Sequence, residues 1–456
     1  MNIDGLIERQ RRYFNAGRTN SIKGRIETLK RLRASIIGHE QDINAALYDD
    51  LGKSPEEAYM CEQGMVLSEL SFMLRNIRRW SRPHHVVTPL AQFHASSFYV
   101  RRPYGVVLIM SPWNYPFMLT MEPLIGAIAC GNCCILKPSA YSPKTSAVIK
   151  SIINESFNSD YLAVVEGGRK ENQALLEQPF DYIFFTGSAS VGKEVMSHAA
   201  KRLIPVTLEL GGKSPCIIDD TAKIDLAAKR IAFGKILNSG QTCVAPDYVL
   251  IDKKIEDRFI ESLKRHFSKM AGKDPLNNSS YPHIINRKHF SRIMGLIDQS
   301  KVVYGGGKDE ASLRIEPTII KDVTLEDAIM QEEIFGPLLP IIPFDEVKEA
   351  IKIVNDRPHP LACYLFSENR SVQRQFINSM QFGGGCINDT IIHLATSRMG
   401  FGGVGSSGMG RYHGKRSFEA FSYEKSIVKK YTWMDMPVRY APYSKLKDTF
   451  LRMFLR

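Results

Sequence analysis

Short apolar runs separated by helical patterns constrain the fold of this chain more than any other feature of its sequence. A run without polar alternation is typical of a parallel strand that is covered on both faces. Strands that alternate with helices predict a parallel sheet with right-handed crossovers, and therefore an α/β fold. Ligands bind such sheets beyond the carboxyl ends of the strands. The runs are Gly105–Met110, Cys133–Lys137, Tyr161–Val165, Tyr182–Phe185 and Thr207–Leu210.

The alternation begins again after residue 211 and predicts a second α/β domain in tandem with the first. The chain has 456 residues, which is enough for two or three domains. The glycine-dense segment Gly400–Gly410 is expected to be irregular. Helical periodicity dominates residues 1–80, and it includes Pro55–Arg79. Further expected elements are strands at Ser96–Arg102, Tyr248–Asp252, Pro317–Ile320, Leu339–Pro343 and Tyr423–Trp433, and helices at Ile22–Ile37, Leu124–Cys130, Ser142–Ser156, Ile224–Leu237, Ile255–Lys269 and Glu346–Asp356.

Charge and hydropathy exclude several classes of function. The net charge of +12 would suit nucleic acid, a membrane surface or an anionic small molecule. Basic residues are mixed with acidic ones except near the two ends, which argues against a nucleic-acid partner. The first eleven residues carry no apolar core of a signal peptide, and no run reaches the ~18 apolar residues of a membrane span. We therefore expect a cytoplasmic protein.

The cysteines do not form a recognisable framework. Their irregular spacing excludes the disulfide pattern of a small secreted protein. Three of them lie close together, but apolar neighbours surround them and no second ligand cluster follows at zinc-like spacing, so we expect no metal. The eight cysteines are Cys61, Cys130, Cys133, Cys134, Cys216, Cys243, Cys363 and Cys386.

Cys243 lies in a different setting from the other cysteines. Its loop, Asn238–Pro246, reads Asn-Ser-Gly-Gln-Thr-Cys-Val-Ala-Pro. A structural cysteine is usually surrounded by Val, Ile and Leu, and such burial leaves the thiol inert. Polar neighbours favour an approachable thiol and hence a nucleophile, although most unpaired cysteines only pack.

Two upstream residues would assist such a nucleophile. Asn114 follows the first strand, where its amide would donate to a developing oxyanion, although turn chemistry also explains an Asn before a proline. Glu209 lies at an apolar strand end, where partial burial raises a carboxyl pKa towards the range of a general base. A buried structural ion pair is the alternative for Glu209.

Other segments fit a dinucleotide. Gly187 and Ser188 follow a strand, and Gly192 opens a helix whose N–H groups would face a phosphate; an ordinary helix cap fits equally well. Lys137 ends a strand at the same sheet edge, where its side chain would reach a cofactor ribose; the alternative is a solvated surface lysine. Glu333 would accept from ribose hydroxyls while Phe335 packs on a flat ring; the alternative is a helix-end charge beside a core Phe.

These motifs resemble, in their order, the aldehyde dehydrogenase family and its class 3 branch. The fold implied is two tandem Rossmann-type three-layer domains with a β-strand arm that builds a dimer. The segments that carry the resemblance are Pro112–Pro116, Leu136–Ser139, Phe185–Ser188, Leu208–Gly212, Gly240–Cys243, Glu333–Pro337 and Gly403–Gly405; Ala245–Asp247, Tyr412–Lys415 and Ser417–Phe418 point to class 3.

The resemblance implies a role for each matching residue. Cys243 would be the nucleophile, Glu209 the base that activates water, and Asn114 an oxyanion donor together with the backbone N–H of Cys243. The reaction implied is oxidation of an aldehyde to a carboxylic acid through a thiohemiacetal and a thioester. The cofactor, NAD or NADP, would contact Trp113, Lys137, Ser139, Gly187, Ser188, Gly192, Glu333 and Phe335.

The resemblance also implies a domain plan. An NAD(P)-binding domain would comprise residues 1–80 and 102–211, and a catalytic domain residues 212–422. Residues 81–101 and 423–440 would form the bridging arm of a homodimer, and residues 441–456 a basic tail. This short basic tail differs from that of membrane-anchored relatives, which carry a long apolar C-terminus. Peripheral membrane contact stays an alternative.

One position departs from the family. Ala140 stands where the family often has a glutamate that binds the ribose 2′-hydroxyl. Removing a carboxylate relieves repulsion against a 2′-phosphate, so we expect NADP⁺ to be accepted alongside NAD⁺. Two alternatives to an aldehyde dehydrogenase that makes a carboxylic acid are a coenzyme A-acylating dehydrogenase, which releases the thioester to a thiol rather than to water, and a catalytically silent binding protein of the same fold. Glu209 argues against the first, because only hydrolysis needs a water-activating base.

Overall fold

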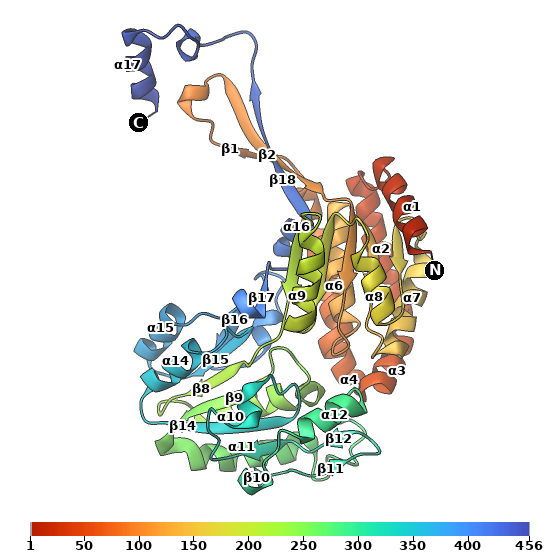
Figure 1. The fold of residues 1–456 in the computed structure, drawn as a ribbon, viewed down its shortest axis with the longest axis vertical. Coiled ribbons are helices and arrows are strands. Elements are labelled where there is room, and N and C mark those ends of the chain that lie inside the picture. The colour runs from red at the N-terminus through yellow and green to blue at the C-terminus, as the bar shows by residue number, and fades with distance from the viewer. Residues whose placement is uncertain (1, 456) are drawn as a thin grey trace.

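The computed structural model describes residues 2–455 and places two α/β bodies below a protruding arm (Figure 1). The first body is built on a six-stranded sheet with the order β17-β7-β6-β3-β4-β5. All neighbouring strands are parallel except β17, which pairs antiparallel with β7. Its strands are β3 (Val106–Met110), β4 (Cys133–Lys137), β5 (Leu162–Val164), β6 (Tyr182–Thr186), β7 (Val206–Glu209) and β17 (Gly408–Met409).

Helices cover this sheet in more than one layer. The crossover helix α6 packs on β3 and β4, and α2 and α5 pack against α6. The apolar runs explain the arrangement, because every residue of β3, β4, β5 and β6 is buried. The helices are α1 (Ile3–Asn15), α2 (Ile22–Gly38), α3 (Glu40–Leu51), α4 (Pro55–Ala58), the π-helical turn η1 (Tyr59–Gln63), α5 (Gly64–Trp80), α6 (Met118–Cys130), α7 (Pro143–Ser156), α8 (Arg169–Leu176), α9 (Ala189–Ala200) and α16 (Lys415–Ala420).

The second body is built on a seven-stranded sheet with the order β10-β13-β14-β9-β8-β15-β16. Only the edge strand β10 runs antiparallel to its neighbour. The strands are β8 (Pro215–Ile218), β9 (Tyr248–Asp252), β10 (Val302–Tyr304), β13 (Thr318–Ile320), β14 (Leu338–Phe344), β15 (Ala362–Phe366) and β16 (Gly384–Ile387), with a small hairpin of β11 (Lys308–Asp309) and β12 (Arg314–Ile315).

Helices and short turns complete the second body. The helices are α10 (Ile224–Ile236), α11 (Glu256–Ala271), α12 (Arg287–Met294), α13 (Ala328–Gln331), α14 (Val347–Asn355) and α15 (Arg370–Ser379). The 3₁₀ turns are η3 (Leu237–Gly240), η4 (Lys253–Ile255), η5 (Gln299–Lys301), η6 (Ile392–Leu394) and η7 (Gly405–Ser407).

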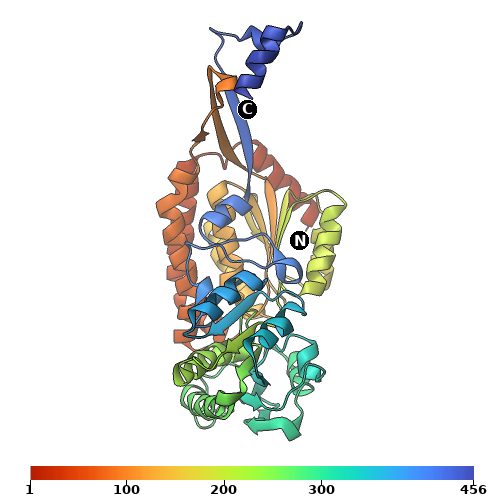
Figure 2. The same cartoon turned by 90° about the vertical axis from the view of Figure 1, so that its left-hand side faces the viewer.

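The arm is a three-stranded antiparallel sheet that stands away from both bodies in the two views (Figure 1 and Figure 2). Its long strands, β2 (Ala95–Pro103) and β18 (Ser422–Lys430), pair along their whole length, and β1 (His84–Val86) pairs with β2. The turns η2 (Leu90–Gln92) and η8 (Pro437–Arg439) and the helix α17 (Lys445–Phe454) lie at the arm's tip. The basic tail predicted at residues 441–456 thus contains the helix α17; its last residue, Arg456, lies outside the described residues, as does Met1.

Three expected elements differ from the structure. The helix expected from Leu124 begins at Met118, because the carboxylate of Glu62 accepts the N–H groups of Phe117 and Met118 and so supports an earlier start. The helix expected over 55–79 contains the π-helical turn η1. The glycine-dense segment is not wholly irregular, since Gly408–Met409 forms β17.

The position of β17 depends on glycine. Gly408 has a φ of 144°, and a Cβ there would lie 2.2 Å from the carbonyl oxygen of Leu208. Only a residue without a side chain lets the segment approach β7 this closely. Residues of the second half of the chain, β17 and α16, therefore join the first body.

Candidate active site

The polar loop around Cys243 is folded into the interior. Asn238, Ser239 and Gly240 all have positive φ values, of 50°, 54° and 72°, which turn the chain sharply after α10. Gln241 is buried; its amide donates to the carbonyls of Asn238 and His283, and its oxygen accepts the N–H of Ile285. The polar neighbours thus hold the loop in place through hydrogen bonds.

Cys243 itself remains accessible because it lies where two cavities meet. The first cavity has a volume of about 300 Å³, and it lies between the carboxyl ends of β3, β6 and β7 and the amino ends of β9, β14 and β15. The second has about 150 Å³ and is almost wholly apolar. Its walls include Met60, Met65, Tyr115, Met118, Phe233, Leu237, Ile391, Ile392 and Leu394, and Cys243 lines both cavities.

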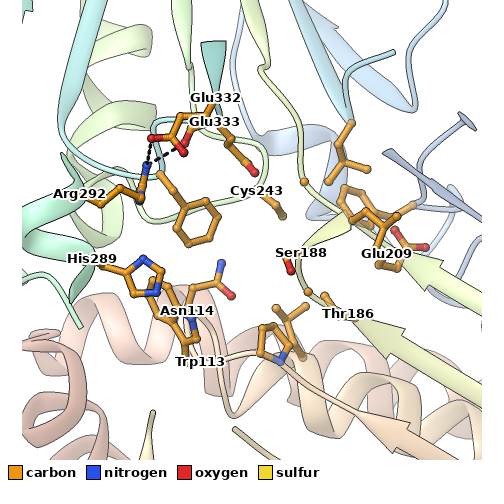
Figure 3. Close-up of a pocket in the computed structure, with 18 of the residues that line it drawn as sticks. Trp113, Asn114, Thr186, Ser188, Glu209, Cys243, His289, Arg292, Glu332 and Glu333 are labelled. Atoms are coloured by element: carbon orange, nitrogen blue, oxygen red, sulfur yellow. Dashed lines mark hydrogen bonds and ion pairs between the residues drawn. The ribbon is translucent and has the colours of Figure 1, made fainter. Parts of the chain in front are cut away.

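Asn114 reaches the cysteine loop from the segment that follows β3. Its side-chain amide donates to the carbonyl of Gln241 at 3.1 Å, two residues before the thiol. Its own backbone carbonyl accepts hydrogen bonds from Lys53 Nζ at 2.9 Å and Asn238 Nδ2 at 2.8 Å. Figure 3 shows Asn114 and Cys243 in the same cavity, carried by different elements. An amide held in place in this way is suited to donate a hydrogen bond to an oxyanion.

Glu209 lines the same cavity from the end of β7 (Figure 3). The side chain is buried, and neither carboxylate oxygen has a hydrogen-bond partner within residues 2–455. Burial raises the pKa of this carboxyl well above its usual value, and the nearby Arg411 only partly opposes the shift. No ion pair of Glu209 is found within the described chain, so the alternative of a structural ion pair is not supported.

The thiol of Cys243 is not ionised by its surroundings. Burial, followed by the charges of Glu333 and Glu209, raises the pKa of Cys243 to about 12. The backbone N–H groups of Cys243 and Val244 act in the opposite direction. Burial therefore favours the protonated thiol in the free protein, so attack by the sulfur requires removal of the thiol proton.

The glycines after β6 shape one wall of the first cavity. Ser188 lines this cavity and caps the N-terminus of α9, and its Oγ accepts the N–H of Val191 at 3.4 Å. A Cβ on Gly187 would lie 2.6 Å from the ring of Phe185, and one on Gly192 would lie 2.6 Å from Leu210. The close packing leaves a helix N-terminus open to an anion such as a phosphate.

The opposite wall carries aromatic and acidic groups. The rings of Trp113 and Phe335 meet edge to face at 5.3 Å. Burial raises the pKa of Glu333 to about 8, with the charge of Asp247 as the next cause. Arg292 holds this segment through the backbone carbonyl of Glu333 at 3.2 Å and the carboxylate of Glu332 at 3.4 Å (Figure 3). Hydroxyl donors such as those of a ribose fit this wall.

Lys137, Ser139 and Gly192 do not line the cavity that holds Cys243. Lys137 ends β4 beside Met110, at the same sheet edge, and is only 3% exposed, so a solvated lysine is excluded. Its Nζ donates to the carbonyl of Pro138 at 2.7 Å, and burial lowers its pKa to about 8. Ser139 accepts the N–H of Tyr141 at 3.2 Å. Lys137 and Ser139 therefore lie along the edge of the first sheet rather than at the thiol of Cys243.

Several lining residues were not predicted. His289 and Arg292 come from α12, whose polar face gave no local signal. Phe401, in the glycine-dense segment, and Tyr412, just after it, form a bridged pair that also lines the cavity. Within residues 2–455 no group of three or more metal-binding side chains is found, and no helix there has the length and hydropathy of a membrane span.

Comparison with known proteins identifies the family. The family model described as "Aldehyde dehydrogenase family" matches residues 1–427. The chain belongs to the aldehyde dehydrogenase family. The chain is 47% identical over 446 residues to 4,4'-diaponeurosporen-aldehyde dehydrogenase of Staphylococcus aureus, covering 97% of each protein. It is 42% identical over 452 residues to aldehyde dehydrogenase family 3 member H1 of Arabidopsis thaliana, covering 98% of this chain and 93% of that one.

Two further relatives support the aldehyde dehydrogenase assignment. A dog protein named "Aldehyde dehydrogenase, dimeric NADP-preferring" is 43% identical over 443 residues, covering 96% of this chain and 98% of the dog chain. The structure described as the substrate-bound state of Staphylococcus aureus AldH superposes with a TM-score of 0.98 at 46% identity over the full length of both chains. The predicted fold and class 3 resemblance are confirmed. The activity is NAD(P)-dependent oxidation of aldehydes, and neither alternative function is supported.

Proposed function

We propose that this aldehyde dehydrogenase uses Cys243 to oxidise apolar aldehydes to carboxylic acids. The observation that carries the proposal is the position of the thiol, which lines both the larger cavity and the apolar cavity. An aldehyde in the apolar cavity would present its carbonyl to the thiol. A dinucleotide in the larger cavity would face the same atom from the other side.

The first step is attack by the sulfur of Cys243 on the carbonyl carbon, which forms a C–S bond. The S–H bond breaks and the thiol proton passes to solvent water, while the carbonyl oxygen takes the C=O π electrons and becomes an oxyanion. Asn114 Nδ2 and the backbone N–H of Cys243 donate to this oxygen. When bound, the oxidised nicotinamide supplies a hydride acceptor, which converts the thiohemiacetal into a thioester.

Glu209 serves the second half of the reaction. In its ionised form, the carboxyl of Glu209 accepts a proton from water, and the water oxygen attacks the thioester carbonyl. The C–S bond then breaks, which releases the acid and restores the sulfur of Cys243. The buried oxygens of Glu209 support this role, because no side chain among residues 2–455 forms a hydrogen bond with them.

The cofactor site follows from the cavity walls. Gly187 and Ser188 would place the α9 N-terminus against the pyrophosphate, while Gly192 keeps that helix close to the strand. Glu333 would hold the nicotinamide ribose, beside the aromatic pair of Trp113 and Phe335. Lys137 and Ser139, further along the sheet edge, would hold the adenosine ribose. Residues 1–80 and 102–211 would thus form the cofactor domain, and residues 212–422 most of the catalytic domain.

The assembly and location are proposed on separate grounds. The arm, residues 81–101 and 423–440, would build a homodimer; Val87 and Trp433 on it are 94% and 65% exposed, and the dog relative is named dimeric. Sedimentation should give twice the chain mass, and a monomer at micromolar concentration would contradict the dimer. All eight cysteines are free, which supports a reducing compartment such as the cytoplasm.

The substrate class rests on the walls of the apolar cavity. The Staphylococcus aureus relative is named for 4,4'-diaponeurosporen-aldehyde, which supports an apolar aldehyde here. Each buried methylene contributes about 0.8 kcal/mol, so hexanal should exceed propanal by about 60-fold in kcat/KM. Glyceraldehyde, which adds hydroxyls at the same chain length as propanal, serves as the control and should be poorer still. Equal values for all three aldehydes would contradict an apolar binding site.

A further inference from the structure

A buried charged segment lies behind the catalytic loops and has no part in the chemistry described so far. It runs from Lys53 through α4 and η1 to Glu62, and η1 is a π-helical turn, a rare feature that is frequent at functional sites. Lys53 and Glu62 form an ion pair at 2.6 Å, and neither side chain has any solvent exposure.

Both members of the pair hold the segment that carries Asn114. Lys53 Nζ donates to the backbone carbonyl of Asn114 at 2.9 Å. Glu62 Oε2 accepts the N–H groups of Phe117 at 3.0 Å and Met118 at 2.9 Å. The pair thus fixes this segment at its start and at the first turn of α6.

The same segment also holds the cysteine loop. Glu57 Oε1 accepts the backbone N–H of Asn238 at 2.8 Å. Asn238 Nδ2 in turn donates to the carbonyl of Asn114 at 2.8 Å, the same oxygen that Lys53 binds. One N-terminal segment therefore joins two loops that belong to different sheets, one bearing Asn114 and the other Cys243.

Stability alone does not explain the pair. Replacing a buried ion pair by neutral side chains of similar volume is often neutral or stabilising. Catalytic donors, in contrast, must be held within about 0.5 Å of their productive place. We propose that Lys53 and Glu62, assisted by Glu57, are positioning residues that fix the Asn114 amide relative to the Cys243 thiol. The inference rests on the proposed role of Asn114 in the reaction.

A double-mutant cycle tests the inference. The paired variant Lys53→Met/Glu62→Gln keeps the volume and the charge balance, and the introduced glutamine would still accept from the start of α6. The variant removes the donor to Asn114. We expect kcat for hexanal to fall about 10- to 100-fold, as misplaced catalytic groups do. In an Asn114→Ala background the same change should lower kcat less than about twofold, because its effect passes through Asn114.

Two measurements separate positioning from general damage. Alkylation of Cys243 by iodoacetamide, followed on its peptide by mass spectrometry, needs no oxyanion donor and should keep its rate within about threefold in the paired variant. Asp219→Asn is the matched control, since this buried carboxylate binds Thr221 and Ser367 at the far end of β8. It should leave kcat unchanged within about twofold.

The outcomes are distinct. If the paired variant lowers kcat equally in the wild-type and Asn114→Ala backgrounds, or abolishes alkylation of Cys243, positioning through Asn114 would be overturned. The proposed reaction would remain intact. A wild-type kcat for Asn114→Ala would overturn the proposed role of Asn114 and this inference with it. If the paired variant fails to fold, Glu57→Ala replaces it, because Glu57 is not fully buried. This variant should also lower kcat in the wild-type background but not in the Asn114→Ala background. Equal losses of kcat in the two backgrounds would overturn the inference.

Discussion

Replacing Glu209 by glutamine should trap the reaction half-way while making the protein more stable. Glu209 is buried with both carboxylate oxygens unpartnered, and burial raises its pKa well above the usual value. In the unfolded chain the same carboxyl ionises near pH 4.5. The folded state therefore holds a proton that the unfolded state releases, and this difference favours unfolding as pH rises above that value.

The size of the effect follows from this difference. Each pH unit between the two pKa values is worth about 1.4 kcal/mol, so at pH 7 the carboxyl disfavours folding by up to about 3 kcal/mol. Glutamine cannot ionise and removes that cost. At about 2.1 cal/mol/K for each of 456 residues, 1 kcal/mol shifts Tm by about 1 °C. Glu209→Gln should therefore raise Tm by up to about 3 °C at pH 7 and by almost nothing at pH 4.5.

Rapid mixing and calorimetry measure the two effects. With hexanal the variant should release one NAD(P)H per site in a burst and then turn over about 10²- to 10⁴-fold more slowly, because no base activates water. Glu333→Gln, another carboxyl of the same cavity, is the matched control and should weaken cofactor binding without a stalled thioester. A Tm below that of the wild type at pH 7 would contradict the cost of ionising Glu209, and steady turnover at the wild-type rate would contradict its role as the base.

Two further predictions concern the cofactor. Burial lowers the pKa of Lys137 to about 8, so the lysine loses its charge as pH rises through 8. The Kd of NADP⁺, measured by fluorescence, should therefore rise between pH 7 and pH 9. The Lys137→Met variant should show no such rise. Ala140 is exposed at the expected adenosine end of the cofactor site. Ala140→Glu should lower kcat/KM for NADP⁺ about tenfold through charge repulsion and leave kcat/KM for NAD⁺ little changed. Ala140→Gln is the neutral control. Equal NADP⁺ kinetics in Ala140→Glu, or a wild-type preference for NAD⁺ above about a hundredfold, would contradict this account of Ala140.

The strands of the sheets could be predicted because their signal is local. An apolar run such as Val106–Met110 needs no partner to be recognised, and the structure places that strand in the middle of the first sheet. The early start of α6 could not be predicted in this way, since it depends on Glu62, which is more than fifty residues away in the chain. The same holds for β17, which forms only because Gly408 can approach Leu208.

The candidate site was predictable only in part for a similar reason. Cys243, Glu209 and Asn114 lie in recognisable motifs, and the structure brings them to one cavity. The polar residues beside Cys243 indicated an approachable thiol, but they did not reveal that Gln241 is buried and forms hydrogen bonds with His283 and Ile285 on a distant loop. Contacts of this kind arise from tertiary packing, which no local pattern encodes.

The most direct test of the account is to find the acyl group on Cys243. Glu209→Gln, mixed with benzaldehyde and NAD(P)⁺ and quenched in acid, should carry one benzoyl group, and peptide mass spectrometry should place it on Cys243. Cys243→Ala in the same background should bind the cofactor, gain no acyl group and form no NAD(P)H. A benzoyl group on another residue, or continued NAD(P)H production by pure Cys243→Ala protein, would contradict the claim that Cys243 is the nucleophile.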